Sequence, residues 1–130
     1  MTPIAVGLDL VEVARIGRML ERKGEHALRR LLTPAEREYC VRQPVPARHV
    51  AARVAAKEAT YKALQGSAAA RAIGWREIEV VRGWDGRPAV TLHAGAAARA
   101  EELGVTRTLL SLSHTDEHAA AVTLLLAQDG

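Results

Sequence analysis

Two acidic residues in distant segments, with a lysine beside one of them, have the chemistry of a metal and phosphate site. Asp9 follows a short apolar run at residues 4–8, and Glu58 lies in the segment AAKEATYKAL. Lys62 follows Glu58 by four residues, so on a helix the two side chains share one face. Carboxylate oxygens are the ligands that a hard divalent cation prefers, and a nearby ammonium suits a phosphate group. The three residues therefore form a candidate site for a cation and a phosphate-bearing substrate.

Each candidate residue also has an ordinary structural explanation. Asp9 could cap a helix that starts just after it, and Glu58 with Lys62 could be a surface ion pair. His114 stands between two apolar segments, where it could be a plain turn residue. Lys57 interrupts an apolar helical stripe, so its long side chain either reaches along the edge of the core to solvent or lines a pocket. Local patterns alone leave these alternatives open.

Hydrophobic periodicity predicts the elements that must position these residues. Helices are expected at 11–21, 33–42, 48–65 and 96–103, and strands at 1–8 (a buried strand), 75–81, 89–93, 107–113 and 119–126. Thr33, Pro34 and Glu36 form a capping box that starts the second helix. Loops or turns are expected at 43–47, 66–74, 84–88 and 114–118. Because hairpins dominate the second half, the sequence predicts an α+β fold with a mainly antiparallel sheet.

The composition limits the class of protein. The 130 residues suit one domain, 1–130, and their net charge of +3 suits an acidic partner or a polyphosphate. With two Trp, two Tyr and no Phe, the chain lacks the aromatic surface on which nucleic-acid binders stack bases. The single Cys40 excludes an intrachain disulfide and a thiol zinc cluster. With neither a membrane-spanning run nor a signal peptide, we expect a soluble, cytoplasmic protein.

Arginines form a regular stripe on the first predicted helix. Arg15, Arg18 and Arg22 recur at helical spacing, about 200° around the helix from the apolar residues at 13, 16 and 20. Taken by itself, such a face indicates a solvated charged surface.

Three spaced segments, taken together, resemble the holo-acyl-carrier-protein synthase family, the short phosphopantetheinyl transferases. They are VGLDLVEVARI at 6–16, RVAAKEATYKAL at 53–64 and SLSHT at 111–115, in family order. Gly74-Trp75 and Gly86-Arg87-Pro88 are similar to that family as well. The resemblance covers essentially the whole chain and implies the fold of these transferases, a mainly antiparallel sheet packed against helices.

The resemblance also implies an activity. Enzymes of this family move the 4′-phosphopantetheine arm of coenzyme A to a serine of an acyl carrier protein and release adenosine 3′,5′-bisphosphate. Their products serve fatty acid or polyketide biosynthesis. Phosphoryl transfer of this kind depends mainly on positioning and on neutralising charge. Short members of the family assemble as trimers with active sites between subunits, so a trimer is expected here.

The resemblance assigns roles to individual residues. Mg²⁺ would lie on Asp9 and Glu58, and Lys62 would join them as a catalytic cation. Glu58, or a water on the metal, would accept the proton of the carrier serine. Coenzyme A contacts are expected at Lys57, Lys62, Gly86, Arg87, Pro88 and His114. The acidic carrier would dock on Arg15, Arg18 and Arg22.

Two other functions use the same features. A metal-dependent hydrolase of nucleotide pyrophosphates would use the same acids, with water in place of the serine. A basic binding module for RNA or an acidic protein would need neither Mg²⁺ nor coenzyme A, although the scarcity of aromatic residues argues against RNA.

Overall fold

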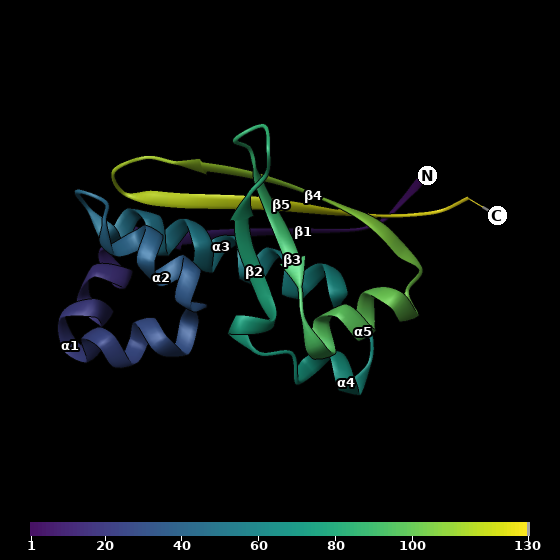
Figure 1. Cartoon of the computed structure of the whole chain (residues 1–130), viewed down its shortest axis with the longest axis horizontal. Coiled ribbons are helices and arrows are strands. Elements are labelled where there is room, and N and C mark those ends of the chain that lie inside the picture. The colour runs from purple at the N-terminus through teal and green to yellow at the C-terminus, as the bar shows by residue number, and fades with distance from the viewer. Residues whose placement is uncertain (130) are drawn as a thin grey trace.

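The computed structural model describes residues 1–129, and a three-stranded antiparallel sheet forms its longest dimension (Figure 1). The strand order is β1 (Thr2–Glu12), β5 (His118–Ala127) and β4 (Val105–His114), so the first and last strands are neighbours. The two chain ends therefore lie together, and the Met1 ammonium bonds Asp129 at 2.8 Å. Strands β4 and β5 form the hairpin expected around 114–118.

One helix, α3 (Pro46–Leu64), packs along the inner face of this sheet. Its alanine-rich sequence, AARVAAKEATYKAL, lets the helix lie close to the strands, and a buried Thr60–Thr123 hydroxyl hydrogen bond of 2.8 Å joins α3 to β5. The sheet side of α3 forms the main core with residues of β1, β2 and β5. This helix carries Lys57, Glu58 and Lys62, so its packing decides where they lie.

Two further helices cover the N-terminal half of the core. The first, α1 (Val13–Leu31), contains a break at Gly24, whose φ of 49° interrupts the regular helix. The second, α2 (Pro34–Val41), begins with the predicted capping box: the Thr33 hydroxyl accepts the Glu36 N–H at 3.3 Å, and the Glu36 carboxylate accepts the Thr33 N–H at 2.8 Å. The prediction of a helix start at this point is confirmed.

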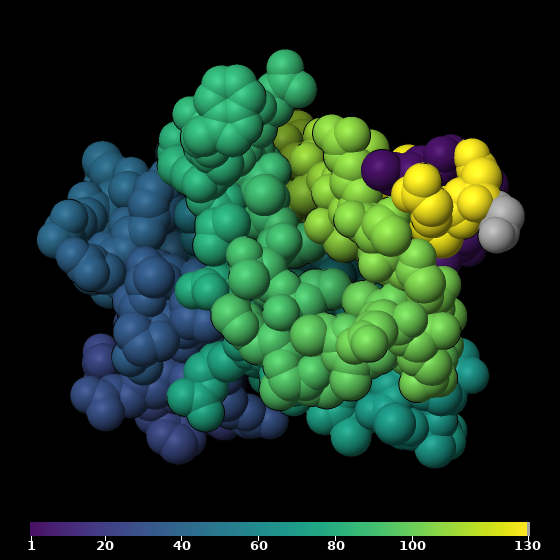
Figure 2. Space-filling model, turned by 45° about the vertical axis from the view of Figure 1, so that its right-hand side comes forward, coloured from purple at the N-terminus to yellow at the C-terminus, as the bar shows by residue number. Residues whose placement is uncertain are grey.

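The remaining segments form a second, smaller layer. A two-stranded antiparallel sheet, β2 (Ile78–Arg82) and β3 (Pro88–Leu92), stands in front of the main sheet in Figure 1. Helices α4 (Ala68–Arg71) and α5 (Ala94–Glu102) pack near the C-terminal end of α3. The turn between β2 and β3 projects from the surface as a knob (Figure 2), and its Trp84 is 99% exposed. All strand pairs are antiparallel, as predicted.

Several predicted bounds are corrected. The first strand continues to Glu12, so the following helix starts at Val13 and not at residue 11. The strand expected from residue 75 begins at Ile78, because residues Trp75–Glu77 form a 3₁₀ turn in which the Glu77 N–H bonds the Gly74 carbonyl at 3.1 Å. The connection at 66–74 contains α4, which Ser67 caps through the Ala70 N–H at 3.1 Å.

Candidate functional site

A glycine on β1 brings the two acidic residues together. A Cβ on Gly7 would lie 1.7 Å from the Ala59 carbonyl oxygen, so only glycine allows α3 to approach β1 this closely. Asp9 lies two residues further along β1 and therefore points to the same face, toward α3. Glu58 precedes Ala59 on the helix, so the close contact sets it beside Asp9.

The structure rules out both ordinary explanations of the acidic pair. Asp9 lies within β1, and the residue at the N-cap of α1 is Glu12, which makes no side-chain capping bond. Lys62 does not pair with Glu58 within residues 1–129. Its Nζ instead donates to Asp9 Oδ1 at 2.8 Å and to the Leu8 carbonyl at 3.1 Å. Asp9, Glu58 and Lys62 thus meet across two elements far apart in the sequence.

The charged groups of Asp9, Glu58 and Lys62 influence one another, and Asp9 shifts the pKa values of both Glu58 and Lys62. Burial raises the pKa of Glu58 to about 7, and the neighbouring Asp9 carboxyl is the second cause. The cations Lys62 and Arg15 oppose this rise, so Arg15 also acts on the pair from α1. The Asp9 carboxylate in turn raises the pKa of Lys62. Asp9 thus pairs with an ammonium, whereas the crowded Glu58 carboxyl has no ion-pair partner within residues 1–129.

The free oxygen of Asp9 makes this pair a good fit for a metal ion. Asp9 Oδ2 is buried and has no hydrogen-bond partner, and its side chain is only 10% exposed. Within residues 1–129 no third Asp, Glu, His or Cys completes a cluster of protein ligands. Mg²⁺ is commonly held by one or two carboxylates together with water and substrate phosphates, so this donor set suits it.

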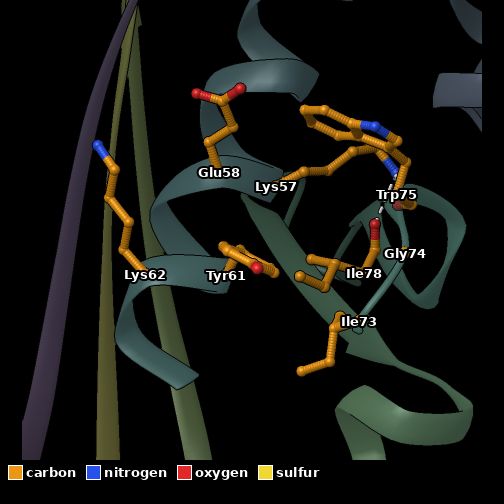
Figure 3. Close-up of a pocket in the computed structure, with 8 residues that line it drawn as sticks. All are labelled: Lys57, Glu58, Tyr61, Lys62, Ile73, Gly74, Trp75 and Ile78. Atoms are coloured by element: carbon orange, nitrogen blue, oxygen red, sulfur yellow. Dashed lines mark hydrogen bonds between the residues drawn. The ribbon is translucent and has the colours of Figure 1, made fainter. Parts of the chain in front are cut away.

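A cavity of about 450 Å³ opens next to the pair (Figure 3). Its walls come from α3 and from the segment between α4 and β2, and most of them are apolar. The lining residues are Lys57, Glu58, Tyr61, Lys62, Ile73, Gly74, Trp75 and Ile78. Lys57 does not reach solvent along the core edge, because its side chain is only 1% exposed and its ammonium ion-pairs with Glu36 at 2.8 Å. A role for its ammonium in binding coenzyme A stays a prediction.

The three predicted docking arginines are exposed on α1. Arg18 forms an ion pair with Glu12 at 3.5 Å, and Arg15 lies near enough to Glu58 to lower its pKa. Further along α1 is a smaller hollow of about 190 Å³ with cationic and apolar walls. Its lining residues, which we call the α1 groove, are Met19, Lys23, His26, Ala27, Arg30, Leu31 and Trp75. The sequence analysis did not identify this groove.

His114 lies in a group of basic side chains, and the sequence patterns pointed only to His114. This basic cluster consists of His49, Arg53, Arg82 and His114. The His49 and His114 rings are 6.2 Å apart, and the Arg53 guanidinium lies 4.2 Å from the Tyr39 ring centroid. Arg53 Nε is buried without a hydrogen-bond partner, and burial followed by the Arg53 charge lowers the pKa of His49. Arg53 is the first residue of the family-like segment RVAAKEATYKAL, and this position was the one sign in the sequence that pointed to Arg53.

The predicted contact at Gly86-Arg87-Pro88 lies apart from the cavity. Gly86 and Arg87 lie in the tight turn between β2 and β3, and Pro88 is the first residue of β3. Gly86 has a φ of 83°, and the Gly83 N–H donates to the Arg87 carbonyl at 2.7 Å. Arg87 is exposed and its guanidinium lies 3.6 Å from the Asp85 carboxylate. Within residues 1–129 the turn does not line the cavity beside Glu58, and its predicted role stays untested.

Comparison with known proteins agrees with these features. Residues 5–123 match the family model of the 4′-phosphopantetheinyl transferase superfamily. The holo-[acyl-carrier-protein] synthase of Solidesulfovibrio magneticus is 45% identical over 120 residues, covering 92% of this chain and 95% of that protein.

Solved structures show the same fold. The crystal structure of holo-[acyl-carrier-protein] synthase from Neisseria meningitidis superposes with a TM-score of 0.82 at 28% identity, over 94% of this chain and 97% of that one. The Helicobacter pylori enzyme, in complex with coenzyme A, gives a TM-score of 0.78 at 27% identity, over 93% and 99% of the two chains. The predicted fold is therefore confirmed, and the chain belongs to the 4′-phosphopantetheinyl transferase superfamily.

Proposed function

We propose that this chain is a holo-[acyl-carrier-protein] synthase. It transfers the 4′-phosphopantetheine arm of coenzyme A to a serine of an apo-acyl carrier protein and releases adenosine 3′,5′-bisphosphate. The family match and the relatives over nearly the whole chain support this activity. The observation that carries it is the buried, unpartnered oxygen of Asp9 beside Glu58 and Lys62, because free carboxylate oxygens suit a metal ion and the ammonium suits the pyrophosphate that the metal would bind.

Asp9 and Glu58 are the proposed holders of Mg²⁺. The metal, when bound, would neutralise the charge that develops on the pyrophosphate. Glu58 is also the proposed acceptor of the proton of the carrier serine: in the metal-free site, burial and the neighbouring Asp9 carboxyl raise its pKa to about 7. Lys62 supplies a mobile ammonium to the phosphates. Near-normal turnover of Glu58→Ala at saturating Mg²⁺ would argue against the role of Glu58.

The basic cluster is suited to the other phosphate of coenzyme A. Arg53 precedes Glu58 by five residues on α3, which is about 8 Å along a helix axis. The same five residues also turn the helix by about 140°, so a ligand with a pyrophosphate and a separate phosphate would contact both places by passing around α3. The predicted contact at His114 fits this arrangement, because the unpartnered Arg53 Nε lies in the same cluster. Arg53→Gln should raise KM for coenzyme A more than KM for 3′-dephospho-coenzyme A.

The carrier is proposed to dock on α1. Arg15, Arg18 and Arg22 are exposed, and the α1 groove adds cations around an apolar floor, a combination that suits an acidic partner with an apolar side chain. Reversing the charge of Arg22 should raise KM for the carrier with little change for coenzyme A. If KM for the carrier and its salt dependence stay unchanged, this face is only solvated.

A trimer is the proposed assembly. The outer face of the main sheet is apolar and open, with Val6, Leu8 and Leu10 each more than 60% exposed. Such a patch is typical of a protein–protein interface. A monomeric mass in solution at working concentration would refute the trimer, and Leu8→Glu should dissociate it.

We place this protein in the cytoplasm, as one transferase domain acting in fatty acid or polyketide biosynthesis. Within residues 1–129 no helix has the length and apolar character to cross a bilayer.

The decisive experiment measures the product. The protein is incubated with an apo-acyl carrier protein, coenzyme A and Mg²⁺, and the intact carrier is weighed by mass spectrometry. Transfer adds the phosphopantetheine mass to the carrier, and a carrier whose serine is replaced by alanine is the control. Release of free phosphopantetheine with an unchanged carrier would instead identify a pyrophosphate hydrolase. Absence of any Mg²⁺-dependent product would refute both activities.

A further inference from the structure

The most completely buried cation of the described chain lies one residue before Glu58. The Lys57 side chain is 1% exposed, and its Nζ donates three hydrogen bonds. The acceptors are Glu36 Oε1 at 2.8 Å, the Trp75 carbonyl at 2.8 Å and the Ile78 carbonyl at 2.6 Å. These acceptors come from α2, the 3₁₀ turn and β2, so one side chain of α3 joins three other elements.

These bonds use the whole donor capacity of the ammonium. A lysine carries three N–H donors and no acceptor. Its counter-charge is fixed as well, since the other oxygen of Glu36 accepts the Val80 N–H at 2.8 Å. Lys57 therefore has no donor left for a phosphate, unlike Lys62, which is 55% exposed.

The two carbonyl acceptors mark the ends of one wall of the cavity. Trp75 and Ile78 bracket the 3₁₀ turn, and both residues line the cavity beside Glu58. Figure 3 shows the Lys57 side chain running from α3 toward this wall, with the Trp75 ring above it and Glu58 nearby. The ammonium thus fixes the distance between α3, which carries Glu58, and the opposite wall.

We propose that Lys57 is a positioning residue that sets the width of the cavity for the pantetheine arm of coenzyme A. The inference rests on the proposed function and concerns the half of the ligand beyond the pyrophosphate. With the pyrophosphate at Asp9 and Glu58, the arm extends into the adjoining cavity. There the apolar side chains of Tyr61, Ile73 and Trp75 suit its dimethyl and methylene groups. Lys57 acts through the wall and does not touch the phosphates.

The test separates the two halves of the ligand. Two variants are measured: Lys57→Met combined with Glu36→Gln, which removes both buried charges, and Trp75→Ala, which shortens the wall and leaves the backbone carbonyl for Lys57. We expect KM for coenzyme A to rise roughly tenfold or more in both. The dissociation constant of adenosine 3′,5′-bisphosphate, which lacks the arm, should stay within about twofold of wild type. If the double variant fails to fold, Lys57→Arg, which keeps the charge and changes the length of the link to the wall, replaces it and is held to the same two constants.

A matched control removes an exposed ion pair by the same substitutions. Glu38 of α2 and Arg42, the C-cap of that helix, pair at 2.6 Å on the surface, and Arg42→Met with Glu38→Gln should change neither constant. An equal loss of affinity for coenzyme A and adenosine 3′,5′-bisphosphate would overturn the proposal in favour of a direct phosphate contact. A lower melting temperature with unchanged KM would reduce Lys57 to a stabilising residue. Wild-type transfer is measured first, so a failure of the proposed activity is recognised separately.

Discussion

Replacing Gly7 by alanine should disrupt the fold and the site together. The added Cβ would lie 1.7 Å from the Ala59 carbonyl oxygen, and contacts under 3.0 Å do not occur. The obstacle is backbone on a buried helix, which cannot rotate away as a side chain could. Helix α3 must therefore move from β1 by about 1.3 Å or more, as the gap from 1.7 to 3.0 Å requires.

Both consequences can be estimated. Overpacking of a close core contact typically costs ~1–3 kcal/mol, and a rigid backbone obstacle belongs at the upper end. For a chain of this size, ~3 kcal/mol lowers the melting temperature by roughly 10 °C. The same movement separates Glu58 on α3 from Asp9 on β1. A displacement of ~1 Å at reacting groups can cost about a hundredfold in rate, so turnover should fall by roughly that factor even below the melting temperature.

The assay combines thermal unfolding with carrier modification at a temperature where the variant is folded. Gly17→Ala is the matched control, because the nearest atom to its added Cβ is the Ala47 Cβ at 4.0 Å. It lies inside helix α1, where alanine is favoured over glycine by ~1 kcal/mol, so this variant should be as stable as wild type or more stable. If Gly7→Ala retains the wild-type melting temperature and turnover, the account of the close contact is wrong.

Three further results follow from the charges and caps. Mg²⁺ affinity should fall about tenfold per pH unit below pH 7, because the raised pKa leaves Glu58 protonated there. Calorimetry measures this affinity, and a value that stays constant from pH 7 to pH 5 would contradict the prediction. Lys62→Met should tighten Mg²⁺ binding to the free enzyme, since it removes a competing cation from Asp9, and should slow transfer. Weaker Mg²⁺ binding by this variant would contradict the prediction. Arg99→Met should lower stability by ~1–3 kcal/mol in chemical denaturation, because Arg99 donates to the carbonyl of Leu64, the last residue of α3, at 2.7 Å and to that of the C-cap Gln65 at 3.0 Å. An unchanged denaturation midpoint would refute that role.

The elements with strong local signals were predictable. Thr33 and Glu36 formed the capping box that the sequence indicated, and α3 differs from its predicted bounds by one or two residues at each end. The first strand was misjudged for a physical reason. Its apolar residues Val6 and Leu8 are exposed, while Gly7 faces the core, so the strand is not buried as expected. An apolar pattern cannot distinguish the core of one chain from a surface that another chain would cover.

The chemistry of the site was less predictable than its residues. The contacts that decide the role of Lys57 come from Glu36, 21 residues earlier, and from two backbone carbonyls, which leave no trace in side-chain patterns. The basic cluster draws Arg53, Arg82 and His114 from separate elements, and the sequence analysis identified only His114. Contacts between residues far apart in the sequence cannot be predicted from helical periodicity, even when one of the residues lies on a regular helix.

The two lysines of α3 have different partners: Lys62 pairs with Asp9 at the acidic pair, and Lys57 pairs with Glu36. Lys57 is locked inside by three acceptors and keeps its place whatever binds. Lys62 is exposed and held by Asp9 at 2.8 Å, so it neutralises the pair from outside. A metal ion on Asp9 would compete with that ammonium, and a displaced Lys62 would be available to a phosphate. A metal ion that bound the unpartnered oxygen of Asp9 first would leave Lys62 on the other oxygen, so the Asp9 charge would stay compensated during the exchange.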